Sequence, residues 1–165
     1  MAQPTHWDEA AARLGLAYEP GSWARRHRLS GTLGGLAVEV ANGDSEYGDT
    51  TDYTVAFPPL GLGLSLRKGG PLRAPGRRLR GELTSGPTGN PEFDRAALVK
   101  CADPDRLALF LDAGRQAVVL RLFEECRGVR ILDDRIRWSS PRLDPPDRIE
   151  AALRTLVEAA TALRH

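Results

Sequence analysis

The segment that most constrains the fold is residues 144–164, DPPDRIEAALRTLVEAATALR. Its apolar side chains recur at helical spacing and form one continuous stripe, which consists of Ile149, Leu153, Leu156, Val157, Ala160 and Leu163. A helix with such a stripe is stable only when the stripe is buried against another layer of structure. The segment therefore predicts a long C-terminal amphipathic helix that packs on one face of a sheet.

The sheet itself is predicted from alternating stretches earlier in the chain. Residues 27–41, HRLSGTLGGLAVEVA, alternate around Gly34 and Gly35, which is typical of a hairpin. The stretches DYTVAF (52–57), LGLSLR (62–67) and AALVKCA (96–102) continue the strand pattern. VRILDDRIRW (129–138) predicts a second hairpin with its turn at two adjacent aspartates.

Helices are predicted at three further places. THWDEAAARLG gives a short N-terminal helix within residues 1–15, with Thr5 as its cap and Gly15 at its end. Asp103 is expected to cap a helix that begins at Pro104, and residues 112–114 are expected to divide the following apolar run into two helices. The chain is therefore predicted to be one α+β domain over residues 1–165, with a meandering antiparallel sheet, helices inserted before the last hairpin, and a surface loop at 68–77.

Charge and composition exclude a general attraction to polyanions. Lys and Arg total 23 and Asp and Glu total 22, a formal net charge of +1, so any binding to nucleic acid would have to be local. No apolar run reaches the length of about 18 residues that a membrane helix needs, and the N-terminal sequence has no signal-peptide pattern. We expect a cytoplasmic protein without membrane contact. Cys101 and Cys126 are expected to be buried thiols, with a bridge between them left open.

Residues that usually carry catalysis are sparse and scattered. The chain has three histidines, His6, His27 and His165, and neither a GxSxG motif nor a phosphate-binding glycine loop. Its cysteines and histidines lack metal-ligand spacing. We therefore expect no enzymatic activity, no metal and no cofactor. If the protein were an enzyme, the carboxylates to substitute first would be Asp94, Asp133 and Asp134.

Two charged segments are candidates for binding. The acidic segment at 44–52 lacks the residue order of a calcium loop and is expected to be a solvated hairpin loop. The basic segment at 67–80, RKGGPLRAPGRRLR, contains six basic residues, which are Arg67, Lys68, Arg73, Arg77, Arg78 and Arg80. This basic segment is either a binding site for phosphate, RNA or an acidic partner, or a solvated loop whose charges pair with the acidic segment.

The stretch TGNPEFD at 88–94 is interpreted as a structural corner. Its Gly-Asn-Pro sequence predicts a turn, Phe93 is expected to be buried, and Asp94 is expected to accept hydrogen bonds from nearby amides. The longer stretch GNPEFDRAALVKCADPDRLALFL (89–111), the early glycine hairpin and GVRILDDRIRW (128–138) together resemble an uncharacterised family of small bacterial domains. The resemblance covers residues 79–140, and it implies a fold but no reaction and no site residue.

These observations favour a non-catalytic protein-interaction or adaptor module of a bacterial cytoplasmic assembly. Two alternatives remain open. One is a binder of small apolar ligands with a cavity between the sheet and the C-terminal helix. The other is contact with nucleic acid or phosphate through the basic segment at 67–80.

Overall fold

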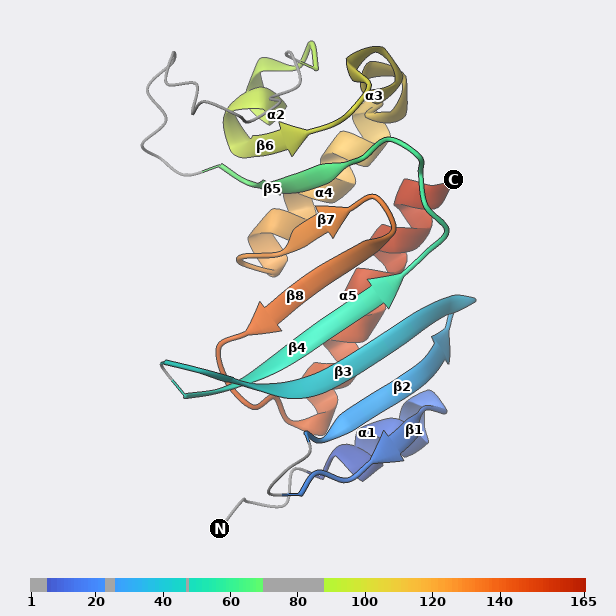
Figure 1. Ribbon diagram of the computed structural model, residues 1–165, viewed down its shortest axis with the longest axis vertical. Helices are drawn as coiled ribbons and strands as arrows, with labels where there is room; N and C mark the ends of the chain where they lie inside the picture. Colours follow the sequence, from blue (N-terminus) through green and yellow to red (C-terminus); the bar gives the residue numbers. More distant parts are fainter. Residues whose placement is uncertain (1–5, 23–25, 47, 70–87) are drawn as a thin grey trace.

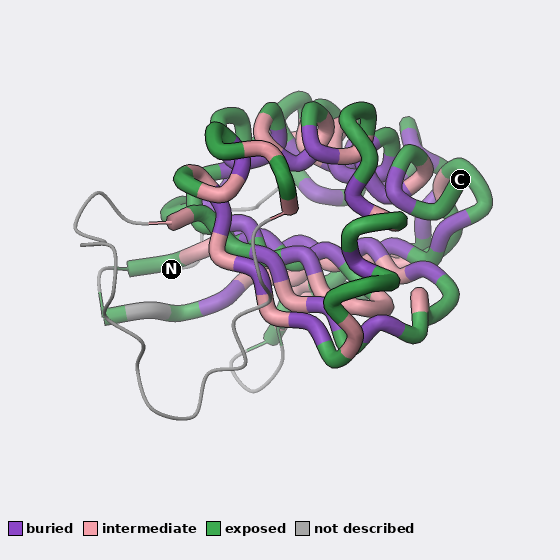
Figure 2. The backbone as a smooth tube through the Cα atoms, turned by 90° about the horizontal axis from the view of Figure 1, so that it is seen from above, coloured by how far each residue is buried: buried purple, intermediate pink, exposed green. Residues whose placement is uncertain are grey.

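A computed structural model describes residues 6–22, 26–46, 48–69 and 88–165. The chain forms one eight-stranded sheet, all of whose paired strands are antiparallel, with its long helices on one face (Figures 1 and 2). The strands are β1 (Ala17–Glu19), β2 (Arg28–Leu33), β3 (Leu36–Ser45), β4 (Gly48–Ala56), β5 (Ser65–Lys68), β6 (Ala97–Lys100), β7 (Arg130–Leu132) and β8 (Arg135–Ser140). The helices are α1 (Trp7–Leu14), α2 (Pro91–Ala96), α3 (Pro104–Phe110), α4 (Ala113–Glu125) and α5 (Pro146–Arg164). The predicted α+β architecture is confirmed.

The strand order is a meander only in its first half. Strands β1 to β4 lie side by side in chain order, and the sheet continues as β8, β7, β5 and β6. The hairpin β7–β8, which comes late in the chain, is thus inserted between β4 and β5 (Figure 1). This insertion places Trp138 of β8 opposite Tyr53 of β4, and Ile131 of β7 opposite Leu66 of β5.

The hydrophobic core lies between the sheet and the helices. All six residues of the predicted stripe on α5 are buried, and α5 packs against β4, β8, α1 and α4. Burying each large aliphatic side chain of this stripe stabilises the fold by about 1.5–3 kcal/mol. The C-terminal helix therefore covers the sheet as predicted.

Short polar side chains determine where the helices between β5 and β7 begin. The side chains of Asn90, Asp103 and Asp112 accept hydrogen bonds from the first free amides of α2, α3 and α4, which the helices themselves leave without partners. Phe93 is fully buried, and the Asp94 carboxylate accepts hydrogen bonds from the amide and hydroxyl of Thr88 at 2.9 and 2.8 Å. The interpretation of 88–94 as a structural corner is confirmed, with the addition that Pro91–Ala96 form a short helix.

The predicted hairpins at Gly34–Gly35 and Asp133–Asp134 are both present. The prediction of a loop at 44–52 is wrong, because β3 continues to Ser45 and β4 starts at Gly48. Threonines 50 and 51 favour extended backbone, and this end of the hairpin projects from the sheet (Figure 1). Solvent can therefore reach Asp44, Glu46 and Asp49 while the strand pairing continues.

Several smaller predictions have clear outcomes. Helix α1 lies within the expected range and ends at Gly15, whose φ of 67° suits glycine. Thr5, the expected cap, lies outside the described residues.

Cys101 and Cys126 are buried and not bridged, and burial raises the pKa of the Cys126 thiol to about 11. The predicted loop at 68–77 begins with the last residue of β5, and its residues 70–77 lie outside the described part of the chain. Among the described helices, none combines the length and the apolar character needed to cross a bilayer.

A buried polar cluster that the sequence did not reveal ties the start of α5 to the sheet. The carboxylate of Asp144 accepts hydrogen bonds from the hydroxyls of Tyr53 and Ser140 at 2.8 and 3.0 Å and pairs with Arg148 at 3.0 Å. Its amide donates to the hydroxyl of Thr51 at 2.8 Å. Burial, followed by the nearby Asp144 charge, raises the pKa of Tyr53 far above its ordinary value. These partners offset the cost of burying a charged group.

Candidate functional site

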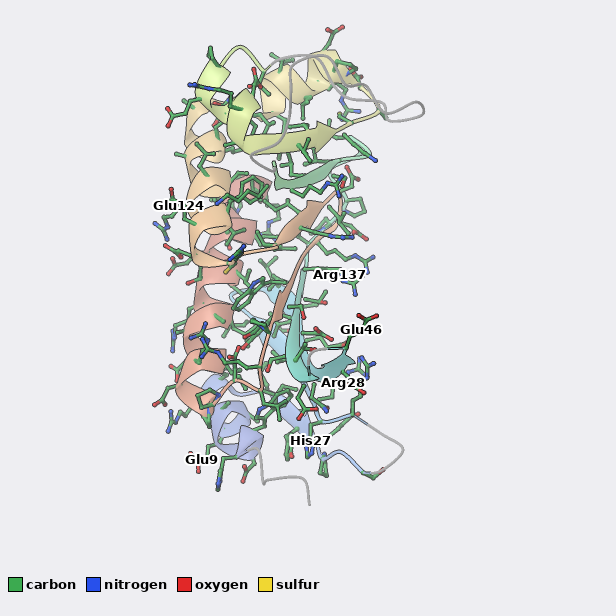
Figure 3. The ribbon with its side chains drawn as sticks, turned by 90° about the vertical axis from the view of Figure 1, so that its left-hand side faces the viewer. Glu9, His27, Arg28, Glu46, Glu124 and Arg137 are labelled. Atoms are coloured by element: carbon green, nitrogen blue, oxygen red, sulfur yellow. The ribbon has the colours of Figure 1, made fainter. Side chains whose placement is uncertain are left out.

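The candidate site lies on the face of the sheet that points away from the helices, which we call the outer face (Figure 3). Side chains alternate between the two faces of a strand. On β8, Ile136, Trp138 and Ser140 are buried towards the helices, whereas Arg135, Arg137 and Ser139 are exposed on the outer face. Figure 3 shows Arg137 extending from the sheet on the side opposite the helices. No described helix covers this face.

Three arginines lie directly opposite one another on adjacent strands of the outer face. Arg67 of β5 is in register with Arg130 of β7, and Arg130 is in register with Arg137 of β8. We call these three residues the arginine row. Neighbouring strands are about 4.8 Å apart, and directly opposed residues have Cβ atoms about 4.5–5.5 Å apart. The row therefore places three positive side chains close together across the middle of the sheet.

The arginine row lies in a hollow of about 610 Å³ that extends across β4, β8, β7, β5 and β6. Lys100 of β6 adds a fourth basic side chain. The hydroxyl-bearing residues Thr54, Ser65 and Ser139 and the leucines Leu98 and Leu132 also line the hollow. Its volume is within the range of about 300–1,000 Å³ that is typical of small-molecule sites.

Asp52 is the one carboxylate among the described lining residues, and it already has polar partners. Its Oδ1 accepts a hydrogen bond from the hydroxyl of Ser139 at 2.6 Å, and its Oδ2 lies 4.0 Å from a guanidinium nitrogen of Arg26. Within the described ranges, no carboxylate forms an ion pair with Arg130 or Arg137, in contrast to Arg135 beside them, which pairs with Asp134 at 2.6 Å. Among the described lining residues, four are therefore basic and one is acidic.

The basic segment predicted from the sequence contributes one residue to this site. Arg67 belongs to the arginine row, whereas Lys68 follows it on β5 and is placed by strand alternation on the opposite face. Arg73, Arg77, Arg78 and Arg80 lie outside the described residues. The sequence analysis missed Arg130 and Arg137, although their alternation with Ile131, Ile136 and Trp138 indicated an arginine-rich outer face.

The three carboxylates selected for substitution each accept hydrogen bonds from other residues of the chain. Asp94 holds the turn before α2. Asp133 accepts hydrogen bonds from the amides of Gly61, Leu62 and Leu64 at 3.0, 2.8 and 3.1 Å. Although partial burial opposes it, these hydrogen bonds lower the pKa of Asp133. The hydrogen bond from Arg135 lowers the pKa of Asp134.

The space beneath α5 was the other predicted binding site. Ile149, Leu153, Leu156 and Leu163 are fully buried there. A smaller hollow of about 210 Å³ lies between α4 and α5, where Val118 and Ala159 are among its lining residues. This hollow and the hollow on the outer face do not lie between α5 and the sheet. In the described residues, no group of three or more His, Cys, Asp or Glu could hold a metal ion.

Comparisons with known proteins identify a structural neighbour but no family. The chain matches no known family by sequence, and no curated protein matches it. The resemblance to an uncharacterised family over residues 79–140 thus stays a prediction. One solved structure with a similar fold is the crystal structure of the mycobacterial trehalose monomycolate transport factor A, TtfA. The two chains are 18% identical, the match covers 95% of this chain and 92% of the other, and the TM-score is 0.61. At this identity, the likeness shows a shared fold.

Proposed function

We propose that the protein is a non-catalytic binding module that receives an anionic partner on the outer face of its sheet. The observation that carries this proposal is the arginine row, which lies in a hollow on the sheet face that points away from the helices. The adaptor role predicted from the sequence is the form of this proposal in which the partner is a protein with an acidic segment.

The titratable groups near the hollow support binding over catalysis. The arginine and lysine side chains that line the hollow act as hydrogen-bond donors. The hydroxyl of Tyr53 is directed to the buried Asp144, and its pKa is raised. His27, which precedes β2, accepts a hydrogen bond from the amide of Gly21 at 3.0 Å and is not among the lining residues. General acid–base catalysis needs a group that exchanges protons near the operating pH.

The shared fold is in keeping with an accessory role. The neighbour with a TM-score of 0.61 is named a transport factor. From this likeness we take only that the present chain is a binding module. We infer the chemical class of its partner from the charge of the outer face.

Binding of a decaglutamate peptide at low ionic strength tests the proposal. We expect the wild-type chain to bind it, and we expect Arg130→Gln/Arg137→Gln to weaken binding at least about tenfold, because each charge-assisted hydrogen bond contributes about 1.5–3 kcal/mol. Affinity should also fall as salt is added. Isothermal titration calorimetry measures both effects.

The matched control is Arg121→Gln/Arg154→Gln, which removes the same charge from the helix side. Arg121 pairs with Glu125 and Arg154 pairs with Glu150, at 3.2 and 2.7 Å. This control should bind the peptide as the wild type does. Equal loss in both double variants, or no binding by the wild type, would contradict an anion site on the outer face.

A further inference from the structure

We infer that the ligand of the arginine row is a phosphate monoester that carries a compact apolar group. This inference rests on the proposed function, because it names the chemical class of the anion that the outer face binds. It is supported by three features of the hollow: its hydrogen-bond donors, the spacing of its arginines, and its leucines.

The first feature is an excess of hydrogen-bond donors. Arg130 and Arg137, with which no described carboxylate forms an ion pair, donate but cannot accept hydrogen bonds. Of the two Asp52 oxygens, Oδ1 already accepts a hydrogen bond from Ser139, and Oδ2 lies 4.0 Å from Arg26. A complementary ligand therefore has many acceptors and few donors. A phosphate monoester meets this requirement with three terminal oxygens, whereas an extended peptide also brings backbone N–H groups that need acceptors.

The second feature is the direct opposition of Arg130 and Arg137. Directly opposed residues have Cβ atoms about 4.5–5.5 Å apart. Both guanidinium groups can therefore reach the same phosphate group when it lies between them. A guanidinium presents two parallel N–H donors to two oxygens of a phosphate. A phosphate with a charge of about −1.5 to −2 also neutralises two arginines at once, whereas one carboxylate neutralises only one.

The third feature is the pair of leucines beside the arginines. Leu98 of β6 lies opposite Arg67, and Leu132 of β7 lies opposite Ser65, which is itself opposite Lys100. Both leucines are half-buried and line the hollow. An apolar group joined to the phosphate can cover them and remove their apolar surface from water, which is favourable. Inorganic phosphate cannot make this contact.

The test compares phenyl phosphate, inorganic phosphate and benzoate in NMR titrations of the full chain, monitored at the arginine Nε–Hε signals. We expect phenyl phosphate to shift the signals of Arg130 and Arg137 and to bind at least about tenfold more tightly than either other ligand. Arg130→Gln and Arg137→Gln should each weaken phenyl phosphate binding about tenfold. Arg121→Gln on the helix side should leave it unchanged.

A second experiment distinguishes a soluble phosphate ester from a lipid headgroup, since both contain a phosphate monoester. Vesicles of phosphatidylcholine, with and without phosphatidic acid, are mixed with the wild-type chain and with the two outer-face variants. Binding that needs phosphatidic acid and both arginines, without phenyl phosphate binding, would assign the phosphate to a lipid. Binding of phenyl phosphate alone would assign it to a soluble ester.

The inference is overturned if benzoate binds as tightly as phenyl phosphate, or if neither variant weakens binding in either arm. Binding of decaglutamate then distinguishes a failure of the phosphate inference from a failure of the proposed anion site. If the peptide still needs Arg130 and Arg137, the outer face binds anions but is not a phosphate site. If the peptide also fails to bind, the proposed function falls as well.

Discussion

Arg130 has an arginine directly opposite it on each neighbouring strand, Arg67 on one side and Arg137 on the other. Like charges that face each other across a sheet destabilise it. An arrangement of this kind is characteristic of binding sites, where residues serve a ligand at some cost to the stability of the fold. The arginine row is therefore where stability and function are expected to conflict.

Replacing Arg130 by threonine should make the ligand-free protein more stable. The change removes both like-charge oppositions and introduces a residue that favours strands. We expect Tm to rise by about 1–3 °C at low ionic strength, and the gain to shrink when salt screens the charges. Differential scanning calorimetry at two salt concentrations measures this effect.

Arg135→Thr is the control for this prediction, because Arg135 is also exposed on the outer face but pairs with Asp134. It should leave Tm unchanged or lower it. If Arg130→Thr lowers Tm as much as the control does, the row is not under electrostatic strain.

At the scale of elements, the turn of the β7–β8 hairpin also organises the loop before β5. Asp133 in this turn accepts hydrogen bonds from three amides of residues 61–64. Amides that lose such an acceptor are left without a partner, at a cost of about 1–3 kcal/mol when they are shielded from water. One side chain thus joins two elements that are far apart in the sequence.

Asp133→Ala should destabilise the protein at neutral pH by about 1–3 kcal/mol, and the difference from wild type should shrink in acid. The folded-state pKa of Asp133 lies below its ordinary value of 3.8. Its contribution is therefore present above that value and is lost as the pH falls through the folded-state pKa. Urea unfolding at pH 7 and pH 3 measures both differences.

Asp134→Ala is the matched control, because Asp134 pairs with exposed Arg135 and its side chain accepts no amide from residues 61–64. It should cost clearly less at pH 7. A loss for Asp133→Ala that stays the same at both pH values would show that its charge is not responsible.

Most elements could be predicted because their signals are local. The stripe on α5, the Gly34–Gly35 turn, the cap at Asp103 and the break at 112–114 each depend on residues within a few positions of one another. The short helix at 91–96 was missed because its six residues are too few for a periodic pattern. The acidic hairpin was misread because polar residues indicate solvent exposure, which strands that project from a sheet also have.

At the scale of the whole molecule, the strand order could not be predicted from these local signals. The pairing of residues 51–56 with 135–140, and of 65–67 with 130–132, joins segments that are distant in the sequence. The arginine row depends on this second pairing, because it places Arg67 beside Arg130. The sequence could therefore suggest Arg67 as a binding residue but could not identify its neighbours.

Because the β7–β8 hairpin is inserted in the sheet, we expect the molecule to unfold as one cooperative unit. Strand β8 pairs with β4 and strand β7 pairs with β5, so the hairpin joins the two parts of the sheet, β1–β4 and β5–β6. Trp7 and Trp138 are both buried, so their near-ultraviolet signals report on the packing of the core. Near-ultraviolet and far-ultraviolet circular dichroism should give coincident urea transitions. Two separate transitions would contradict a single cooperative unit.

The position of the β7–β8 hairpin also has a consequence for synthesis on the ribosome. Until residue 140 has emerged, β4 and β5 each lack a neighbour that the finished sheet provides. Unpaired strand edges attract other extended chains and promote aggregation. Nascent chains that stall before residue 129 should therefore be the form of this protein that most depends on chaperones.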